Sequence, residues 1–279
     1  MIAREVSACM AMAALAASCD VGAPSATYLQ GPKGTQLVRE LAMVRGARVL
    51  FMHHSVGRNL LAGVVALDAE AGGGRMRLMT LEDAIADAGP MLAHFSGGRN
   101  TDPKGKMDAF ALALQSNRHV PFDFAFMKLC YADIDPRTDL DGLLAHYERT
   151  IASIRRARPD VRIGHVTVPL KTRPSDLKAR IRRFFGLMVW EDAANVKRAE
   201  FNERLARAFP NDAIFDLANV EATRGDGRSM FEHDGHLYPA LHSGYSEDGG
   251  HLNESGRRAA AGAAIRFLSV AVTAEDALR

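Results

Sequence analysis

The sequence predicts an α/β fold in which helices cover both faces of a parallel β-sheet. Apolar runs of strand length alternate with segments of helical periodicity along the whole body of the chain. The 279 residues are 47% hydrophobic and 24% charged, and no linker-like stretch divides the body. One globular domain is therefore favoured over two.

The first strand candidate is a continuous apolar run that ends in polar residues, as expected of a buried parallel strand. Five segments share strand-like character: residues 48–54, 76–80, 122–131, 161–170 and 213–217. Cys130 lies in the third of them, where a cysteine is more typical of packing than of catalysis.

Helical periodicity marks four segments between and after these strands: residues 59–70, 140–157, 193–209 and 255–272. Two stretches, residues 79–115 and 171–192, lack a regular pattern. The second contains Phe184, Phe185 and Trp190, which fit either a lid on the substrate side or the anchor of a surface excursion.

The balance of charge argues against a nucleic-acid partner. The formal net charge is +2, with basic and acidic residues interleaved. Two arginine-rich runs, residues 155–158 and 178–183, lie in helix-like segments without an aromatic stacking platform. Solvated helix faces explain them better than a polyanion site.

The N-terminus resembles an export leader. Arg4 precedes a small, mostly apolar run that is too short to span a bilayer, so residues 1–18 are predicted to be a signal peptide. Residues 15–19 resemble a bacterial lipobox, in which Cys19 becomes the lipidated first residue. An ordinary cleaved secretory signal is the alternative.

This reading divides the chain into a leader, a tether at residues 19–36 that is rich in Gly, Pro and Ser, and a folded domain at residues 37–279. The expected location is the periplasm or cell envelope. Membrane attachment is expected only through Cys19.

Ser55 is the first candidate for a catalytic group. It follows the first predicted strand directly, which places its hydroxyl at the carboxyl edge of the sheet and near a helix N-terminus. Gly57 would permit a tight turn into the next helix. The alternative is that Ser55 only caps that helix.

Asp248 and His251 are the second candidate group. They lie in a glycine-rich loop just before the last predicted helix, which Asn253 or Ser255 can cap. At this spacing the carboxylate can orient one ring nitrogen, and the other can then act as a general base toward Ser55. A purely structural Asp–His hydrogen bond is the alternative.

With Ser55 after the first strand and Asp248-x-x-His251 before the last helix, the chain resembles the SGNH/GDSL hydrolase superfamily. This resemblance implies a flavodoxin-like three-layer sandwich of about five parallel strands. It also implies a Ser-His-Asp triad and ester hydrolysis without a cofactor. Residues 53–57 read His-His-Ser-Val-Gly in place of the usual Gly-Asp-Ser, as in a divergent branch.

The resemblance also implies an oxyanion hole. Its loop glycine matches best at Gly98, whose amide would act with that of Ser55. The block that normally reads Gly-x-Asn-Asp is residues 130–133 here, which lacks the asparagine but keeps Asp133. The resemblance implies that Asp133 lies among the oxyanion and substrate-binding residues. Asn100 is the proposed substitute donor, and His54 is expected to support Ser55 or contact substrate.

A metal site is the weaker alternative for the histidines. Residues 232–236 together with His242 combine His and carboxylate at short spacing. No H-E-x-x-H or C-x-x-C pattern supports such a site, so neither a metal nor another cofactor is expected.

The predicted function is therefore that of an exported serine esterase or acyl transferase, with a small-molecule or polysaccharide ester as its substrate. A catalytically idle envelope protein that binds a glycan or a partner is the alternative. The missing asparagine favours this alternative, whereas the intact Ser, Asp and His argue against it.

Overall fold

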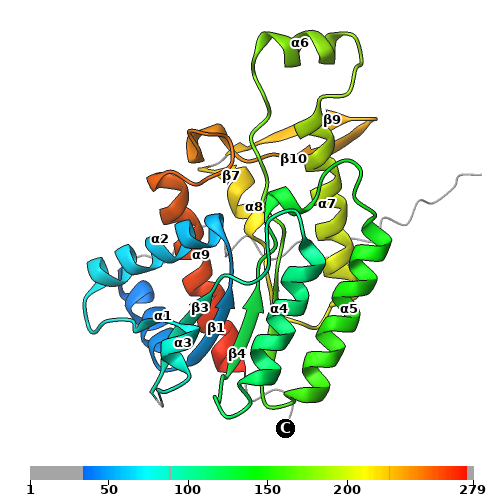
Figure 1. The fold of residues 1–279 in the computed structure, drawn as a ribbon. Helices are drawn as coiled ribbons and strands as arrows, with labels where there is room; N and C mark the ends of the chain where they lie inside the picture. The colour runs from blue at the N-terminus through cyan, green and yellow to red at the C-terminus, as the bar shows by residue number, and fades with distance from the viewer. Residues whose placement is uncertain (1–33, 88, 226, 275–279) are drawn as a thin grey trace, which may run out of the picture.

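The computed structural model describes residues 34–87, 89–225 and 227–274. Its centre is one sheet of six parallel strands in the order β2-β3-β1-β4-β5-β6 (Figure 1). The strands are β1 (Arg48–Met52), β2 (Leu78–Thr80), β3 (Met91–Phe95), β4 (Phe124–Met127), β5 (Arg162–Val166) and β6 (Ile214–Phe215). The predicted α/β sandwich is therefore confirmed.

Alternate residues of each strand point to opposite sides of the sheet, and both sets are buried in β1. Helices therefore cover both faces. Phe51 of β1 packs in the core beneath α1 (Thr35–Arg45), α2 (Ser55–Ala71), α8 (Leu217–Ala222) and α9 (Glu254–Thr273). Leu50 and Met52 face the other core, beneath α3 (Leu81–Ala84), α4 (Pro103–Ser116), α5 (Leu140–Ala157) and α7 (Trp190–Ala208). These are the three layers of a flavodoxin-like sandwich.

The prediction of about five strands missed one. Strand β3 lies within residues 79–115, where the sequence shows no regular pattern, and helix α4 begins in that stretch and ends one residue after it. Helix α6 (Leu177–Phe184) lies in the second such stretch. Predicted strands 122–131 and 161–170 are shorter in the structure, whereas the helix at residues 140–157 was predicted with the right bounds.

Short elements complete the fold. Two antiparallel pairs join β7 (Thr223–Arg224) to β8 (Gly227–Arg228) and β9 (Met230–His233) to β10 (His236–Pro239). Single 3₁₀ turns lie at Tyr131–Asp133 and Ser243–Tyr245. Among the described residues, no helix combines the length and apolar character needed to cross a bilayer.

The predicted leader, most of the predicted tether and Cys19 lie outside the described residues. Helix α1 begins at Thr35, so the last two residues of the predicted tether already belong to the fold. Cys130 is buried, as expected of a packing residue. Arg158 differs from the solvated helix face predicted for its run, because its buried guanidinium binds three backbone carbonyls at the end of α4 and just after it.

Helices α2 and α9, which are far apart in the sequence, make a close contact. A Cβ on Gly63 of α2 would lie 2.5 Å from the carbonyl oxygen of Arg257 and 2.8 Å from the Cβ of Ala261. Only glycine allows this approach. Because α9 follows the loop of His251 directly, the contact also fixes that loop relative to the start of α2.

Two ionisable side chains are buried near the carboxyl ends of the strands. Lys128 follows β4, is fully buried, and donates to the carbonyl of Leu129 at 3.0 Å, and burial lowers its pKa. Glu221 of α8 accepts the N–H of Leu170 at 2.7 Å. Burial raises the pKa of Glu221 to about 8, against the opposing effect of Lys128 and Arg198.

Replacing Gly63 should weaken the α2–α9 contact. Gly63→Ala places a methyl group against the backbone of α9, so we expect the free energy of unfolding to fall by about 1–3 kcal/mol. Gly46→Ala is the matched control, because the nearest atoms to its Cβ lie 3.5 Å away. Urea denaturation measures both, and equal stabilities of the two variants would contradict this packing argument.

The raised pKa of Glu221 should make stability depend on pH. Glu221 ionises near pH 4.5 when unfolded and near 8 when folded, so the folded state holds the extra proton between these values. The free energy of unfolding therefore falls as pH rises through this window. Glu221→Gln keeps an acceptor for Leu170 and removes the titration.

We expect the loss of Tm between pH 5 and pH 8 to be about 5–10 °C smaller in Glu221→Gln than in the wild type. Glu148→Gln, at an exposed position on α5, is the control and should leave the slope unchanged. Parallel curves of Tm against pH for Glu221→Gln and the wild type would show that Glu221 is ionised in the fold.

Candidate active site

The candidate site lies at the carboxyl edge of the sheet, where the loops after β1, β3 and β4 meet. The chain passes from β3 to β4 across β1, so the strand order reverses beside β1, and ligands of open α/β sheets typically bind at such a point. The N–H of His53 donates to Phe95 and that of Lys128 donates to Met52, both at 3.0 Å. These two hydrogen bonds continue the parallel pairing of β1 with β3 and β4 by one residue beyond the strand ends.

Asp248 and His251 are paired as predicted. The Nδ1–H of His251 donates to the Asp248 carboxylate at 2.6 Å, so Nε2 is the ring nitrogen that carries no proton and can accept one. The second oxygen of Asp248 accepts the backbone N–H groups of Gly250 at 2.9 Å and His251 at 2.7 Å. The bonds from His251 and from these amides hold the pKa of Asp248 well below its usual range.

The loop around this pair is fastened at three points. The N–H of Leu252 donates to the side chain of Asn59 at 3.2 Å, and the carbonyl of Gly249 accepts the N–H of Thr172 at 3.0 Å. The hydroxyl of Tyr131 lies 3.5 Å from Nε2 of His251, with the two rings edge to face. The imidazole remains 43% exposed, so a substrate can reach it.

Ser55 is the first residue of α2 and is half-buried. The residue in the capping position is His54, so the alternative in which Ser55 caps the helix does not hold. Asn59, which binds the His251 loop, lies one helical turn after Ser55. Gly57 lies inside α2 rather than in a turn, and its missing Cβ lets the helix pack on the ring of His53.

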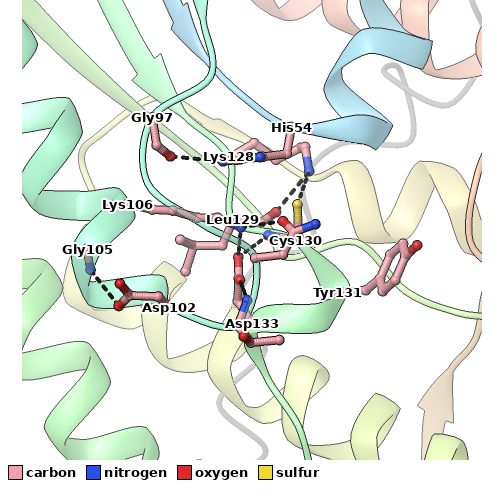
Figure 2. Close-up of polar contacts among 12 residues, drawn as sticks. His54, Gly97, Asp102, Gly105, Lys106, Lys128, Leu129, Cys130, Tyr131 and Asp133 are labelled. Atoms are coloured by element: carbon pink, nitrogen blue, oxygen red, sulfur yellow. Dashed lines mark hydrogen bonds and ion pairs between the residues drawn. The ribbon is translucent and has the colours of Figure 1, made fainter.

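The two adjacent histidines have different surroundings. His53 is buried, its Nδ1–H donates to the carbonyl of His54 at 3.0 Å, and Nε2 accepts from His94 at 3.2 Å. Burial lowers the pKa of His53 to about 4, so its ring is neutral. The Nε2–H of His54 donates to the carbonyl of Gly97 at 2.9 Å, which ties the Ser55 turn to the predicted oxyanion loop (Figure 2).

Asp133 holds two of the loops together from within. Its carboxylate is fully buried and accepts Lys106 Nζ at 2.6 Å, together with the N–H groups of Cys130 at 2.6 Å and Thr101 at 2.9 Å. Figure 2 shows these bonds converging on one carboxylate. Asp133 thus faces protein groups rather than solvent, which corrects its predicted place among the substrate-binding residues.

The loop after β3 is strained where it is held. Thr101 has φ 70°, which is unfavourable for a β-branched residue, and its N–H is the one that Asp133 binds. Gly98 has the same φ, and a Cβ there would lie 2.8 Å from the nitrogen of Lys106. Lys106 also binds the side-chain oxygen of Asn100 at 2.9 Å, which leaves the exposed amide nitrogen of Asn100 free to point elsewhere.

The histidines of the alternative metal site lie in other surroundings. His233 and His236 belong to the β9–β10 hairpin, and Nδ1 of His242 accepts the N–H of Gly244 at 3.0 Å. Across the described residues, no three His, Cys, Asp or Glu side chains come together in a way that suits a metal ion.

Sequence reasoning missed Asn59, Lys106, Tyr131 and Thr172, which hold the candidate groups in place. Asn59 carried a weak signal, because a polar residue four positions after Ser55 lies above it on the same helix face. Lys106 carried none, since its partner Asp133 is 27 residues away and lies beyond the next strand.

Comparisons with known proteins give matches in structure alone. No protein-family model matches the sequence, and no curated protein matches it. A peptidoglycan O-acetylesterase is 10% identical over 88% of this chain and 98% of its own, with a TM-score of 0.51.

Two further solved structures are similar at lower TM-scores. A protein of the G-D-S-L lipolytic family from Desulfitobacterium hafniense is 10% identical over 79% of this chain and 99% of its own, with a TM-score of 0.45. A carbohydrate esterase of family 3 from Talaromyces cellulolyticus is 12% identical over 82% and 99%, with a TM-score of 0.46. The likeness above a TM-score of 0.5 shows that the chain shares the fold of the peptidoglycan O-acetylesterase.

Proposed function

We propose that the protein cleaves or transfers the acyl group of an ester, using Ser55, His251 and Asp248. The observation that carries the proposal is the 2.6 Å hydrogen bond between Asp248 and His251, in a loop fastened to α2 one turn after Ser55. A purely structural Asp–His pair would not require the hydrogen bond from Leu252 to Asn59, which fixes the His251 loop to α2, the helix that begins at Ser55.

In this mechanism, Ser55 Oγ attacks the ester carbonyl while Nε2 of His251 takes its proton. Asp248 stays ionised because its pKa is lowered, so it can stabilise the imidazolium that forms. His251 then returns the proton to the departing alkoxide. Water, or a second hydroxyl in acyl transfer, attacks the acyl-enzyme by the same steps in reverse and frees Ser55.

The developing oxyanion would lie against the N-terminus of α2 and the loop after β3. The amides of the first turn of α2 have no partners within the helix, and the helix dipole favours negative charge there. The amide of Gly98 and the amide nitrogen of Asn100 are the further donors that we propose. His54 and Asp133 act as positioning residues for this loop, through Gly97 and Thr101.

A carbohydrate ester is the substrate class that we favour. One similar structure, with a TM-score of 0.51, is that of a peptidoglycan O-acetylesterase, which supports a small acyl group on a sugar hydroxyl. Both groups of the Asp248–His251 pair are well exposed, as suits a polymer that binds across an open edge. Export and lipidation at Cys19 remain proposals from the sequence.

Removing the nucleophile should abolish turnover of a simple acetyl ester. We expect Ser55→Ala and His251→Ala each to lower kcat for p-nitrophenyl acetate by about 10⁴-fold or more, because the residues act as one unit. Ser255→Ala is the control, since Ser255 is exposed in the first turn of α9 and four residues from His251.

A wild-type enzyme that does not hydrolyse the ester, or a Ser55→Ala variant with full activity, would contradict the proposal. The first outcome would favour the idle glycan-binding alternative, which isothermal titration with acetylated oligosaccharides would then test.

Asn100→Asp separates the role of the side-chain oxygen of Asn100 from that of its amide nitrogen. The variant keeps an oxygen for Lys106 but loses the N–H donors, so we expect kcat to fall about 100- to 1000-fold with little change in Tm. An unchanged kcat would assign the missing oxyanion donor to another group. Asn117→Asp, at the end of α4, is the control for the added charge.

A further inference from the structure

The excursion between β5 and α7 carries an exposed apolar cluster. Helix α6 stands away from the body of the molecule at the top of Figure 1. Half of the fourteen large hydrophobic side chains that are exposed in the described chain lie here: Leu177, Ile181, Phe184, Phe185, Leu187, Met188 and Trp190. Scattered exposed apolar residues are normal, but such a concentration marks an interaction surface.

The cluster has a defined face. Leu177, Ile181 and Phe184 follow one another at helical spacing and are 69%, 47% and 83% exposed. Phe185 lies edge to face with Phe184, with ring centroids 5.2 Å apart. Gly186, at φ 64°, then turns the chain so that the next two apolar residues extend the same tip.

The tip is rigidly attached at its base. Asp192 of α7 accepts Arg183 at 2.6 Å and Arg173 at 3.0 Å, which ties the start of the excursion and the last turn of α6 to one carboxylate. Asp176 caps α6 by accepting the N–H of Ala179 at 3.0 Å. The Nε–H of Arg182 donates to the carbonyl of Met188 at 2.7 Å. The apolar side chains are therefore held outward in an ordered segment.

Basic residues surround this apolar tip. Residues 173–192 contain five basic residues against three acids, an excess of two in a chain whose net charge is +2. Lys178 and Arg180 are exposed and project from α6 itself. A second copy of the same tip would be repelled by like charge, whereas an anionic surface would be attracted.

We propose that the α6 tip (residues 177–190) docks the protein on the surface of an anionic lipid bilayer. Apolar and aromatic side chains flanked by Lys and Arg, on a short amphipathic helix, suit the boundary between headgroups and acyl chains. The phosphates of anionic lipids would bind Lys178 and Arg180, while Phe184 and Phe185 enter the interface.

Docking would also orient the candidate site. The excursion leaves the body beside that site, because the N–H of Thr172 donates to Gly249, next to Asp248. Contact through α6 would thus turn the carboxyl edge of the sheet toward the bilayer. This inference does not depend on the proposed chemistry, and its test needs no turnover.

Trp190 makes the test local, because it is the only tryptophan in the chain and lies 42% exposed at the base of the tip. Energy transfer from Trp190 to dansyl-labelled lipid can be titrated with the full chain and vesicles of phosphatidylcholine, with or without phosphatidylglycerol. We expect strong transfer with the anionic vesicles and a large loss of transfer at high salt.

Two double variants separate the apolar and ionic parts. Phe184→Ser with Phe185→Ser, and Lys178→Glu with Arg180→Glu, should each weaken the apparent vesicle affinity by at least about tenfold. Leu112→Ser with Val270→Ser, and Arg118→Glu with Arg156→Glu, are the matched exposed controls away from that edge and should bind as the wild type does. Residues 1–33 are the same in every variant, so any vesicle binding that they contribute is shared.

Wild-type titration curves from the two α6 variants would overturn the proposal, as would equal binding to neutral and anionic vesicles. Sedimentation velocity without lipid gives a second check. Self-association that disappears in Phe184→Ser with Phe185→Ser would assign the tip to contacts between copies of the chain and would also overturn it.

Discussion

The buried carboxylate of Asp133 is the contact on which the candidate site depends most. It joins Lys106 at the start of α4 to the backbone of the loops after β3 and β4, and both the carboxylate and the Lys106 side chain lie away from water. A buried ion pair is expensive unless each group is fully bonded, and removing one partner from such a pair typically costs about 3–5 kcal/mol. Because Asp133 and Lys106 keep each other bonded, the pair stays buried and fixes the loop on which Gly98 and Asn100 lie.

The remaining contacts connect Asp133 and its partners to the proposed reactive groups. His54 binds the loop after β3 to the start of α2, and Asn59 binds α2 to the loop of His251. Each link joins segments far apart in the sequence through one hydrogen bond to the backbone. The Lys106–Asp133 pair is buried, whereas the Asp248–His251 pair is exposed. The supporting contacts therefore lie inside the protein, and the proposed reactive groups lie at its surface.

The sequence was sufficient for the parts of the site that are local. Asp248 and His251 lie in one short loop, so their spacing alone predicts their contact. Helix α4 escaped prediction because its buried face includes Lys106, which interrupts the apolar periodicity. Strand β3 has only five residues between irregular segments. The Lys106–Asp133 pair could not be found, because it depends on the order of strands in the folded sheet.

The central claim is that Ser55 is a nucleophile activated by His251. Treatment with a fluorophosphonate, followed by peptide mass spectrometry, measures this most directly, because the reagent forms a stable adduct only with an activated serine. The account predicts a single adduct on Ser55 in the wild type and none in His251→Ala. An adduct on a different serine, or an unmodified Ser55 under conditions that label a known serine esterase completely, would contradict it.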